Sequence, residues 1–445
     1  MRQHPNVCLR RAARAMTLGG AMAVTINFAL LADMVGHGGV IRSVAISADG
    51  RTVLTASFDY SARLWQFDEQ REIVLLDGHE GPVNDAVFLD GGGRAATVGA
   101  DGKVLLWNLA NGTLEAELPG HDGRAMAAAV SADGKVLLSG GWDGRVLLSD
   151  LATHERRLEI KTGAPVTGVG FAHGGRAIVS GGTDGALHVW RSSDGGAVET
   201  FGGHELGVTK MITSADGRWL LSIGQDDTAR LWDLERLSLR AEYTPIPERN
   251  PIAAALAPDG SSLLLAYLDG EVLHFDAARG TFKGSFQAED GPVWSLAYSA
   301  DGRFALTAGA EERVKVWHLE TGDRISVAAE GEDARPQPWL ESRHPGARLF
   351  RKCAGCHALS LDERQRSGPH FSELFGRRAG AVEDYHYSRA LQGSEIVWTK
   401  ESLTALFRDG PDRYLPGTKM PVQRISDEAE LRHLIDYLEL ITHPG

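Results

Sequence analysis

Three side chains in the segment Cys353-Ala354-Gly355-Cys356-His357 have the types and spacing to hold a flat, metal-containing ligand. Two thiols three positions apart lie on one turn of a helix, so both can bond to one edge of such a ligand. The imidazole of the next residue then projects over the centre of the ligand. The spacing therefore predicts two covalent anchors, Cys353 and Cys356, and one nitrogen ligand, His357.

Cys-x-x-Cys-His is the attachment signature of c-type haem, in which both cysteines form thioethers and the histidine binds the iron. The chain has one other cysteine, Cys8, which excludes a framework of structural disulfides. A redox-active dithiol and half of a zinc site are the alternatives. Zinc would need a second pair of Cys or His ligands nearby, and none is evident in the sequence. We therefore predict one covalently attached haem c.

A second axial ligand for the iron is predicted at Met420, within the segment Pro416-Gly417-Thr418-Lys419-Met420-Pro421. A thioether is neutral and soft, so it favours ferrous iron and raises the reduction potential. Every other methionine of the chain precedes the haem motif, so Met420 has no local competitor. The alternative is a methionine that only packs in the core.

Residues 344–441 resemble class I cytochrome c of the mitochondrial type. The resemblance rests on the haem motif, on Gly368-Pro369 at the family's spacing, and on Leu374-Phe375-Gly376-Arg377. It implies a small all-α domain that transfers single electrons, and a hydrogen bond from the His357 imidazole to the Pro369 carbonyl. It also implies contacts near the haem propionates from Arg377, Tyr387, Trp398 and Thr418. We assign residues 342–445 to this domain.

Two helices of such a domain are expected to cross. Apolar residues at helical spacing predict the last helix from Glu428 to about Ile441. The first helix contains Gly346 and Phe350. The resemblance implies that Gly346 lets the two helices approach closely.

An aromatic position recurs through the middle of the chain at steps of 41 to 43 residues. It is occupied by Trp65, Trp107, Ser149, Trp190, Trp232, Phe275 and Trp317. An acid stands six residues before each of them, and a turn dipeptide such as Asp49-Gly50 lies further upstream. Each unit contains short apolar strands, and a closed ring of seven such sheets buries both faces of each sheet.

These units resemble WD repeats, which implies an all-β, seven-bladed β-propeller over residues 28–329. The family's network of His, Ser or Thr, Asp and Trp is expected whole only in the first unit, as His37, Ser57, Asp59 and Trp65. Because the histidines recur at the blade period, they are expected to hold blades together rather than to bind a metal or cofactor. Two segments, Phe28–Met34 and Arg324–Ala328, compete for the outer strand of the last blade.

The N-terminus has the pattern of an export signal. Four arginines precede an uncharged run from Ala15 to about Ala32, and Ala21-Met22-Ala23 fits a small-x-small cleavage site. Residues 1–27 are therefore predicted to direct the protein to the bacterial periplasm, and an uncleaved segment would anchor it to the membrane. Residues 330–341 contain two prolines and several charges and are predicted to be a linker.

The acidic charge of the chain limits the classes of partner. The formal net charge is −13, and the part between the basic N-terminus and the balanced C-terminal domain carries about −17. Nucleic acids and anionic membranes need clustered Lys and Arg on the protein that binds them. We therefore expect redox partner proteins, with a protein docked on the propeller, and no nucleic acid.

The favoured function is an exported c-type cytochrome that transfers single electrons, with the propeller as a partner-docking scaffold and no catalytic residues. One alternative is a propeller oxidoreductase that uses the haem as an internal electron acceptor or donor. Such a propeller would need a unique set of ligands, which the repeats do not show. The other alternative is a redox sensor, in which release of Met420 from the iron changes what the propeller binds.

Overall fold

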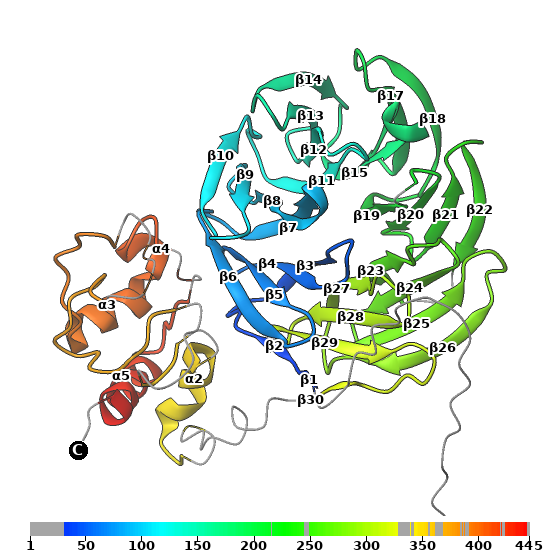
Figure 1. Cartoon of the computed structure of the whole chain (residues 1–445). Helices are drawn as coiled ribbons and strands as arrows, with labels where there is room; N and C mark the ends of the chain where they lie inside the picture. The colour runs from blue at the N-terminus through cyan, green and yellow to red at the C-terminus, as the bar shows by residue number, and fades with distance from the viewer. Residues whose placement is uncertain are drawn as a thin grey trace, which may run out of the picture.

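The computed structural model describes residues 31–214, 216–243, 249–327, 339, 342–354, 357–360, 368–382, 385, 387, 391–418, 420 and 423–442. These residues form a ring of β-sheets followed by a small group of helices (Figure 1). The predicted fold class, an all-β seven-bladed propeller followed by a small all-α domain, is confirmed. The predicted export signal (1–27), Cys356 and nearly all of the predicted linker lie outside the described residues.

Seven four-stranded sheets form the blades. The first four blades contain β3 (Ile41–Ile46), β4 (Thr52–Ser57), β5 (Ser61–Gln66) and β6 (Arg71–Asp77); β7 (Val83–Leu89), β8 (Arg94–Gly99), β9 (Val104–Asn108) and β10 (Leu114–Leu118); β11 (Ala125–Val130), β12 (Val136–Gly141), β13 (Arg145–Asp150) and β14 (Arg156–Lys161); and β15 (Val166–Ala172), β16 (Ala177–Gly182), β17 (Ala186–Arg191) and β18 (Ala197–Gly203). The last three contain β19 (Val208–Thr213), β20 (Trp219–Gly224), β21 (Ala229–Asp233) and β22 (Ser238–Tyr243); β23 (Pro251–Leu256), β24 (Ser262–Tyr267), β25 (Glu271–Asp276) and β26 (Phe282–Gln287); and β27 (Val293–Tyr298), β28 (Phe304–Gly309), β29 (Arg313–His318) and β2 (Met34–Val35).

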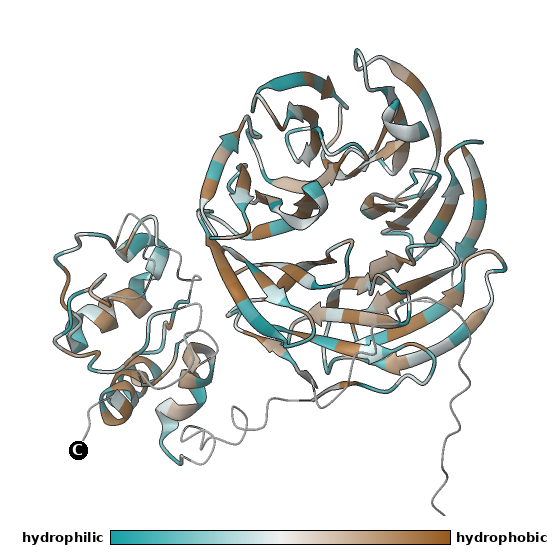
Figure 2. Ribbon diagram, in the orientation of Figure 1, coloured by the Kyte–Doolittle hydropathy of each residue, from teal (hydrophilic) through white to brown (hydrophobic). Residues whose placement is uncertain are grey.

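The first strand of each blade faces the centre of the ring, and the fourth strand lies on its outside (Figure 1). Most of the middle strands are largely buried, as β4 and β8 are. The outer strands are half exposed, and along β22 hydrophilic and hydrophobic residues alternate (Figure 2). The core therefore consists of apolar layers between neighbouring blades, which is why no single sheet would be stable alone.

The predicted turn dipeptides connect the first two strands of most blades. In the first blade Gly50 has a φ of +71°, which favours glycine. The Asp49 carboxylate accepts hydrogen bonds from the Ser47 hydroxyl (2.6 Å) and from the backbone N–H of Arg51 (3.0 Å). An aspartate that bonds to the backbone two residues onward stabilises a tight turn, so these pairs fix the length of each hairpin.

The polar network within the blades uses Thr55 rather than Ser57, so the prediction for the first unit is wrong in this residue. The Thr55 hydroxyl lies 2.7 Å from His37 Nε2 and accepts the indole N–H of Trp65 at 2.9 Å, while His37 Nδ1 lies 2.8 Å from Asp59. Ser57 ends β4, and its hydroxyl donates to the carbonyl of Gly39 instead. Only a hydroxyl further inside the strand is reached by both rings.

The network is also whole in two other blades, so the expectation of a single complete unit is wrong. Each combines a His–Asp pair with a hydroxyl ten residues before the tryptophan. The two sets are His79, Thr97, Asp101 and Trp107, and His204, Ser222, Asp226 and Trp232. Their repetition agrees with a structural role for these histidines.

Both segments that compete for the last blade contribute to it. β2 pairs with the start of β29, through Met34 opposite Val314. Arg324 pairs with Trp317 at the other end of β29, and β1 (Leu31–Ala32) runs parallel to β30 (Ser326–Val327). The two ends of the propeller thus share the closing position, which leaves the ring without a long open edge.

The helical part contains α2 (Pro345–Ala354), α3 (Lys400–Asp409), α4 (Pro411–Tyr414) and α5 (Glu428–Thr442). The predicted last helix is confirmed to within one residue of its end. A Cβ atom on Gly346 would lie 2.0 Å from the backbone oxygen of His433, so the close approach of α2 and α5 requires glycine there. Phe350 and Tyr437 are fully buried at this crossing, with ring centroids 5.7 Å apart.

Candidate functional site

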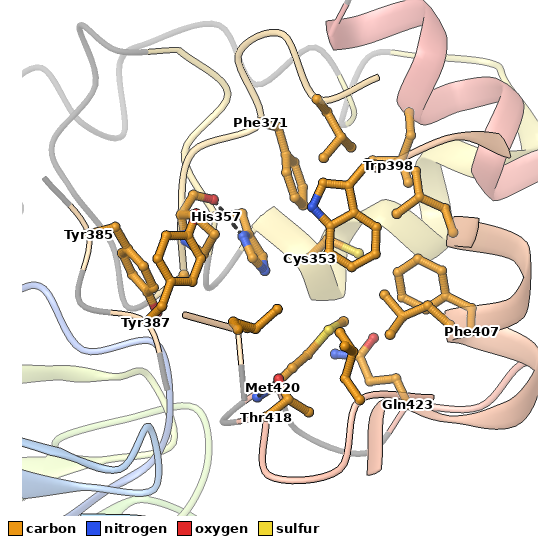
Figure 3. Close-up of a pocket in the computed structure, with 18 of the residues that line it drawn as sticks. Cys353, His357, Phe371, Tyr385, Tyr387, Trp398, Phe407, Thr418, Met420 and Gln423 are labelled. Atoms are coloured by element: carbon orange, nitrogen blue, oxygen red, sulfur yellow. Dashed lines mark hydrogen bonds between the residues drawn. The ribbon is translucent and has the colours of Figure 1, made fainter. Parts of the chain in front are cut away.

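A cavity in the helical part brings together Cys353, His357 and Met420 (Figure 3). Cys353 lies in the last turn of α2, and the His357 N–H donates to its carbonyl at 2.9 Å, which holds His357 close to the end of this helix. The rest of the wall is mostly apolar. It includes Phe371, Leu374, Leu391, Trp398, Leu403, Leu406, Phe407 and Leu415. Such a lining suits a flat hydrophobic ring system.

The His357 ring is held by two contacts. Its Nδ1 lies 2.7 Å from the carbonyl oxygen of Pro369, and a carbonyl only accepts, so Nδ1 carries the hydrogen. Phe371 stacks on the imidazole with centroids 4.3 Å apart and planes inclined by 13°. The lone pair suited to a metal is therefore on Nε2, and the hydrogen bond to Pro369 increases the basicity of the ring.

Met420 reaches the same cavity from the segment that follows α4. Figure 3 shows its side chain and the imidazole of His357 turned into one space. Gly417 adopts a φ of +84° in the turn before it, and the Met420 N–H donates to the hydroxyl of Thr418 at 3.2 Å. An imidazole nitrogen and a thioether sulfur are thus presented to one cavity, which is the donor pair for a six-coordinate haem iron.

The anchor cysteines are described only in part. Cys353 is buried, with 4% of its surface exposed, and lines the cavity. Cys356 lies outside the described residues, so its predicted thioether bond stays a prediction. The residues around Cys353 fit a covalently held porphyrin, since the thiol lies at the wall of an apolar cavity that contains both iron donors.

The predicted propionate contacts line the same cavity. The Arg377 guanidinium donates to the carbonyls of Ser372 (2.6 Å) and His370 (2.7 Å), while its buried Nε has no hydrogen-bond partner in the described structure. Burial lowers the pKa of Arg377 and raises the pKa of the Tyr387 hydroxyl. The backbone N–H of Trp398 donates to the Arg377 carbonyl at 2.9 Å. A buried guanidinium N–H without a described acceptor fits a ligand that carries carboxylates.

Several wall residues were not predicted. Phe371, Tyr385 and Gln423 line the cavity, and the rings of Tyr385 and Tyr387 meet edge to face at 4.7 Å. Two propeller residues, Gly38 and Asp59, also border it. The two tyrosines that flank His386 in the sequence could have predicted an aromatic wall. No sequence pattern indicates that residues of the first blade would lie next to the haem motif.

The described residues contain no group of three or more His, Cys, Asp or Glu side chains that would hold a metal ion. Within the same ranges, no helix is long and apolar enough to cross a membrane. A metal centre built from protein ligands alone is therefore not found in this part of the chain.

The C-terminal part is similar to known cytochromes. Residues 344–441 match the family model described as cytochrome c. Cytochrome c2 of Blastochloris viridis is 35% identical over 100 residues, which cover 22% of this chain and 78% of that protein. Cytochrome c of Stellaria longipes is 37% identical over 95 residues, which cover 21% of this chain and 87% of that protein.

The middle of the chain is similar to WD-repeat proteins. The model for the WD domain, G-beta repeat, matches residues 28–66, 70–108, 112–150, 154–191, 195–233 and 280–318. The nuclear distribution protein PAC1 of Arthroderma otae is 24% identical over 317 residues, which cover 65% of this chain and 61% of that protein. The first three strands of the sixth blade, β23 to β25, lie outside the matched ranges, yet with β26 they form a complete four-stranded sheet.

Proposed function

The chain belongs to the WD-repeat and cytochrome c families, and on that premise we propose that it is an exported electron-transfer protein whose propeller docks a redox partner. The cytochrome c domain implies covalently bound haem c and electron transfer, and the propeller implies a protein-interaction scaffold. Export, the number of haems and the particular roles of residues belong to the proposal.

The observation that carries the proposal is the shared cavity of His357 and Met420. Bound haem supplies a metal that changes its charge by one electron without forming or breaking bonds in the protein. His357, fixed by Pro369 and Phe371, and Met420, fixed by the Gly417 turn, would hold the iron. Two strong-field ligands from a rigid frame keep structural change on electron transfer small, and the apolar wall excludes water.

Covalent attachment is proposed through Cys353 and Cys356. Arg377, Tyr387, Trp398 and Thr418 would surround the propionates; the burial of Arg377 and Tyr387 supports this, because uncompensated carboxylates would be costly there. We propose a single haem, since the sequence has one Cys-x-x-Cys-His motif.

The docking role is supported by aromatic and arginine side chains at the start of the inner strands and in nearby loops of the propeller. Arg42 lies over the ring of Trp294 at 4.8 Å, and Arg124 over Trp142 at 5.1 Å. Trp142 and Phe58 are 47% and 40% exposed. Tryptophan and arginine are enriched among the residues that dominate protein–protein binding energies. We propose this set, Arg42, Phe58, Arg124, Trp142 and Trp294, as the docking face.

Localisation in the bacterial periplasm is proposed from the N-terminal pattern and from the chemistry of haem attachment. The four arginines and the uncharged run of residues 1–32 support export. In bacteria, haem is joined to such cysteines outside the cytoplasmic membrane, as the cytochrome resemblance implies. Membrane attachment is proposed only for a form that retains the N-terminal segment.

The test is the spectrum and potential of the full chain made with a working haem-ligation system. The pigment should resist acid acetone, the ferrous form should be low-spin, and the ferric form should show the weak far-red band of methionine ligation. Met420→Ala should abolish that band and lower the potential, whereas Met211→Leu, at a buried propeller methionine, should change neither. Loss of pigment into acid acetone, or a band that survives in Met420→Ala, would disprove the proposal.

Docking and export are tested separately. The mature protein should be found in the periplasmic fraction and exchange electrons with a protein captured by the full chain. Trp142→Ala should weaken that capture without changing the haem spectrum. Pigmented protein confined to the cytoplasm would refute export, and unchanged capture by Trp142→Ala would refute this docking face.

A further inference from the structure

The side chains that line the central channel of the propeller differ from blade to blade at one position of the inner strand, and the ring that this position forms is called one level of the channel here. Each inner strand has a β-bulge between its first and third residues, and the third residues stand at equivalent positions around the channel. These positions are occupied by Ser43, Asp85, Ala127, Gly168, Lys210, Ala253 and Ser295. Bulges reorient side chains, and two of these seven are charged. Because Asp85 and Lys210 do not follow the repeat, the propeller architecture itself does not require them.

The Asp85 carboxylate is hydrogen-bonded to residues of the channel wall. It accepts hydrogen bonds from the Ser43 hydroxyl (2.7 Å), the Ala128 N–H (3.0 Å) and the Ala86 N–H (3.0 Å). These contacts join the first three blades. The carboxylate is therefore fixed in position. Burial raises its pKa, and these hydrogen bonds and the charge of Lys210 oppose that shift.

Lys210, unlike Asp85, has no side-chain hydrogen-bond partner among the described residues. It lines the same cavity, but no described residue accepts a hydrogen bond from its amine or forms an ion pair with it. Burial lowers the pKa of the amine to about 8, although the Asp85 carboxylate raises it. At neutral pH the group is therefore mainly an ammonium, with three N–H donors that lack a protein acceptor. Lys210 is half-buried and lines the cavity, so a ligand there has room to accept these hydrogen bonds.

Two further donors lie nearby. Arg42 is close enough to interact electrostatically with Asp85 and Lys210, and its buried Nε has no partner in the described structure. The Ser295 hydroxyl accepts the Val44 N–H at 2.9 Å, which leaves its own hydrogen for another acceptor. Arg42 and Lys210 both lie close to the Asp85 carboxylate. The other carboxylate that lines the cavity, Asp216, accepts a hydrogen bond from the Ser214 hydroxyl and lies near Arg218, so Lys210 is the charged lining residue left to pair with an anion.

The cavity at this level has a volume of about 440 Å³, and the turns at Gly174, Gly217 and Pro258 contribute to its wall. Much of its wall is apolar and formed by short side chains. It includes Ala45, Ala129, Ile212, Ala255, Ala297 and Tyr298. A small ligand with one acidic end and a short hydrocarbon part matches both the Lys210 amine and this wall.

We propose that the propeller channel binds a small organic monocarboxylate, with Lys210 pairing with its carboxylate, Ser295 donating a hydrogen bond, and Arg42 adding positive charge. Asp85 is a positioning residue, which fixes the walls and repels dianions. This site is separate from the haem cavity and goes beyond electron transfer, so its test does not depend on the outcome for Met420.

The test is calorimetric titration of the haem-loaded full chain with propionate, in a buffer of low anion content. Propionamide, a neutral analogue, and inorganic phosphate serve as comparisons. Propionate should bind at one site and propionamide should not, while phosphate should bind at least tenfold more weakly. Lys210→Met should weaken propionate at least tenfold, and Lys135→Met, at a side chain that is 73% exposed, should leave it unchanged.

Two further readouts separate binding from structure. Propionate affinity should fall as the pH rises through about 8, because the Lys210 amine then loses its proton. Lys210→Arg should retain binding, which guards against misreading a Lys210→Met variant that folds poorly. No propionate binding by the wild type, equal binding of propionamide or phosphate, or unchanged binding by a folded Lys210→Met would overturn the proposal.

Discussion

The carboxylate of Asp33 forms an ion pair with the guanidinium of Arg324, 291 residues further along the chain. Its side chain is fully buried, and Arg313 lies 3.5 Å away on the other side. Asp33 directly precedes β2, and Arg324 pairs with Trp317 at the far end of β29. A single buried anion therefore joins the two chain segments that close the ring.

Replacing Asp33 should lower the stability of the closed propeller ring. Asp33→Asn leaves the two arginines without their charge partner, and removing one member of a buried ion pair costs about 3 kcal/mol or more. We expect a lower urea midpoint for the propeller, followed by tryptophan fluorescence. The control is Asp122→Asn, which removes an ion pair to Arg145 from a side chain that is 89% exposed. Equal stability of the two variants would show that Asp33 does not close the ring.

The hydroxyl of Thr55 should contribute more to stability than that of Ser57. Thr55→Val keeps the shape but leaves both the His37 and Trp65 ring nitrogens without their shared partner. Each unsatisfied buried group costs about 1–3 kcal/mol, so a loss of roughly 2–4 kcal/mol is expected. Ser57→Ala removes two partly buried bonds, one to the Gly39 carbonyl and a longer one from the Asp59 N–H, and should cost about 1 kcal/mol. Denaturant unfolding of both variants checks the order, and the reverse order would contradict the network described here.

These two cases show what the sequence could and could not predict. The period of Trp65 and its equivalents predicted the number of blades, because one residue per blade must meet the same neighbours. The choice between Thr55 and Ser57 depended on which hydroxyl the rings of His37 and Trp65 both reach. Sequence spacing alone does not show how deep in the blade each hydroxyl lies. The closing strand was left as two alternatives, and the structure uses both because each covers one end of β29.

In the helical part, local chemistry was easier to predict than the wall of the cavity. His357 and Met420 follow from a motif and from the absence of competing methionines, and the structure places both in one cavity. Phe371 and Gln423 were missed because single residues in loops have no periodicity. Asp85 and Lys210 were missed because only the closed ring and its bulges bring them to one level of the channel.

Gly346 should be intolerant of even a methyl group. In Gly346→Ala the new carbon would meet the His433 backbone oxygen at 2.0 Å, and a helix backbone cannot yield cheaply. We expect α2 and α5 to separate and the helical domain to lose several kcal/mol, at least about 3, as in an overpacked core. Far-red absorbance of the ferric haem during denaturation measures this domain alone. An unchanged denaturation midpoint in Gly346→Ala would contradict the close crossing.

Glu289 replaces the histidine of the network in the seventh blade and should make stability depend on pH. Its side chain is 2% exposed, Oε1 has no hydrogen-bond partner in the described structure, and Oε2 accepts the Glu311 N–H at 3.2 Å. The pKa of Glu289 is raised to about 7, mainly by burial and also by the Glu311 carboxylate, while the Glu311 N–H and Lys315 oppose the shift. Lys315 itself pairs with Glu311 at 2.7 Å, so it does not neutralise Glu289 fully.

The sign of the effect follows from the proton balance between the two states. Between the ordinary value of 4.5 and about 7, the folded protein holds a proton that the unfolded chain has lost, so the free energy of unfolding falls as pH rises. Above pH 7 the accumulated penalty approaches about 3 kcal/mol. Glu289→Gln is neutral throughout, so it should flatten this slope and be more stable than the wild type at pH 8. Urea unfolding at pH 5 and 8 measures the difference, with the exposed Glu69→Gln as control; parallel pH profiles of wild type and Glu289→Gln would exclude Glu289 as the titrating group.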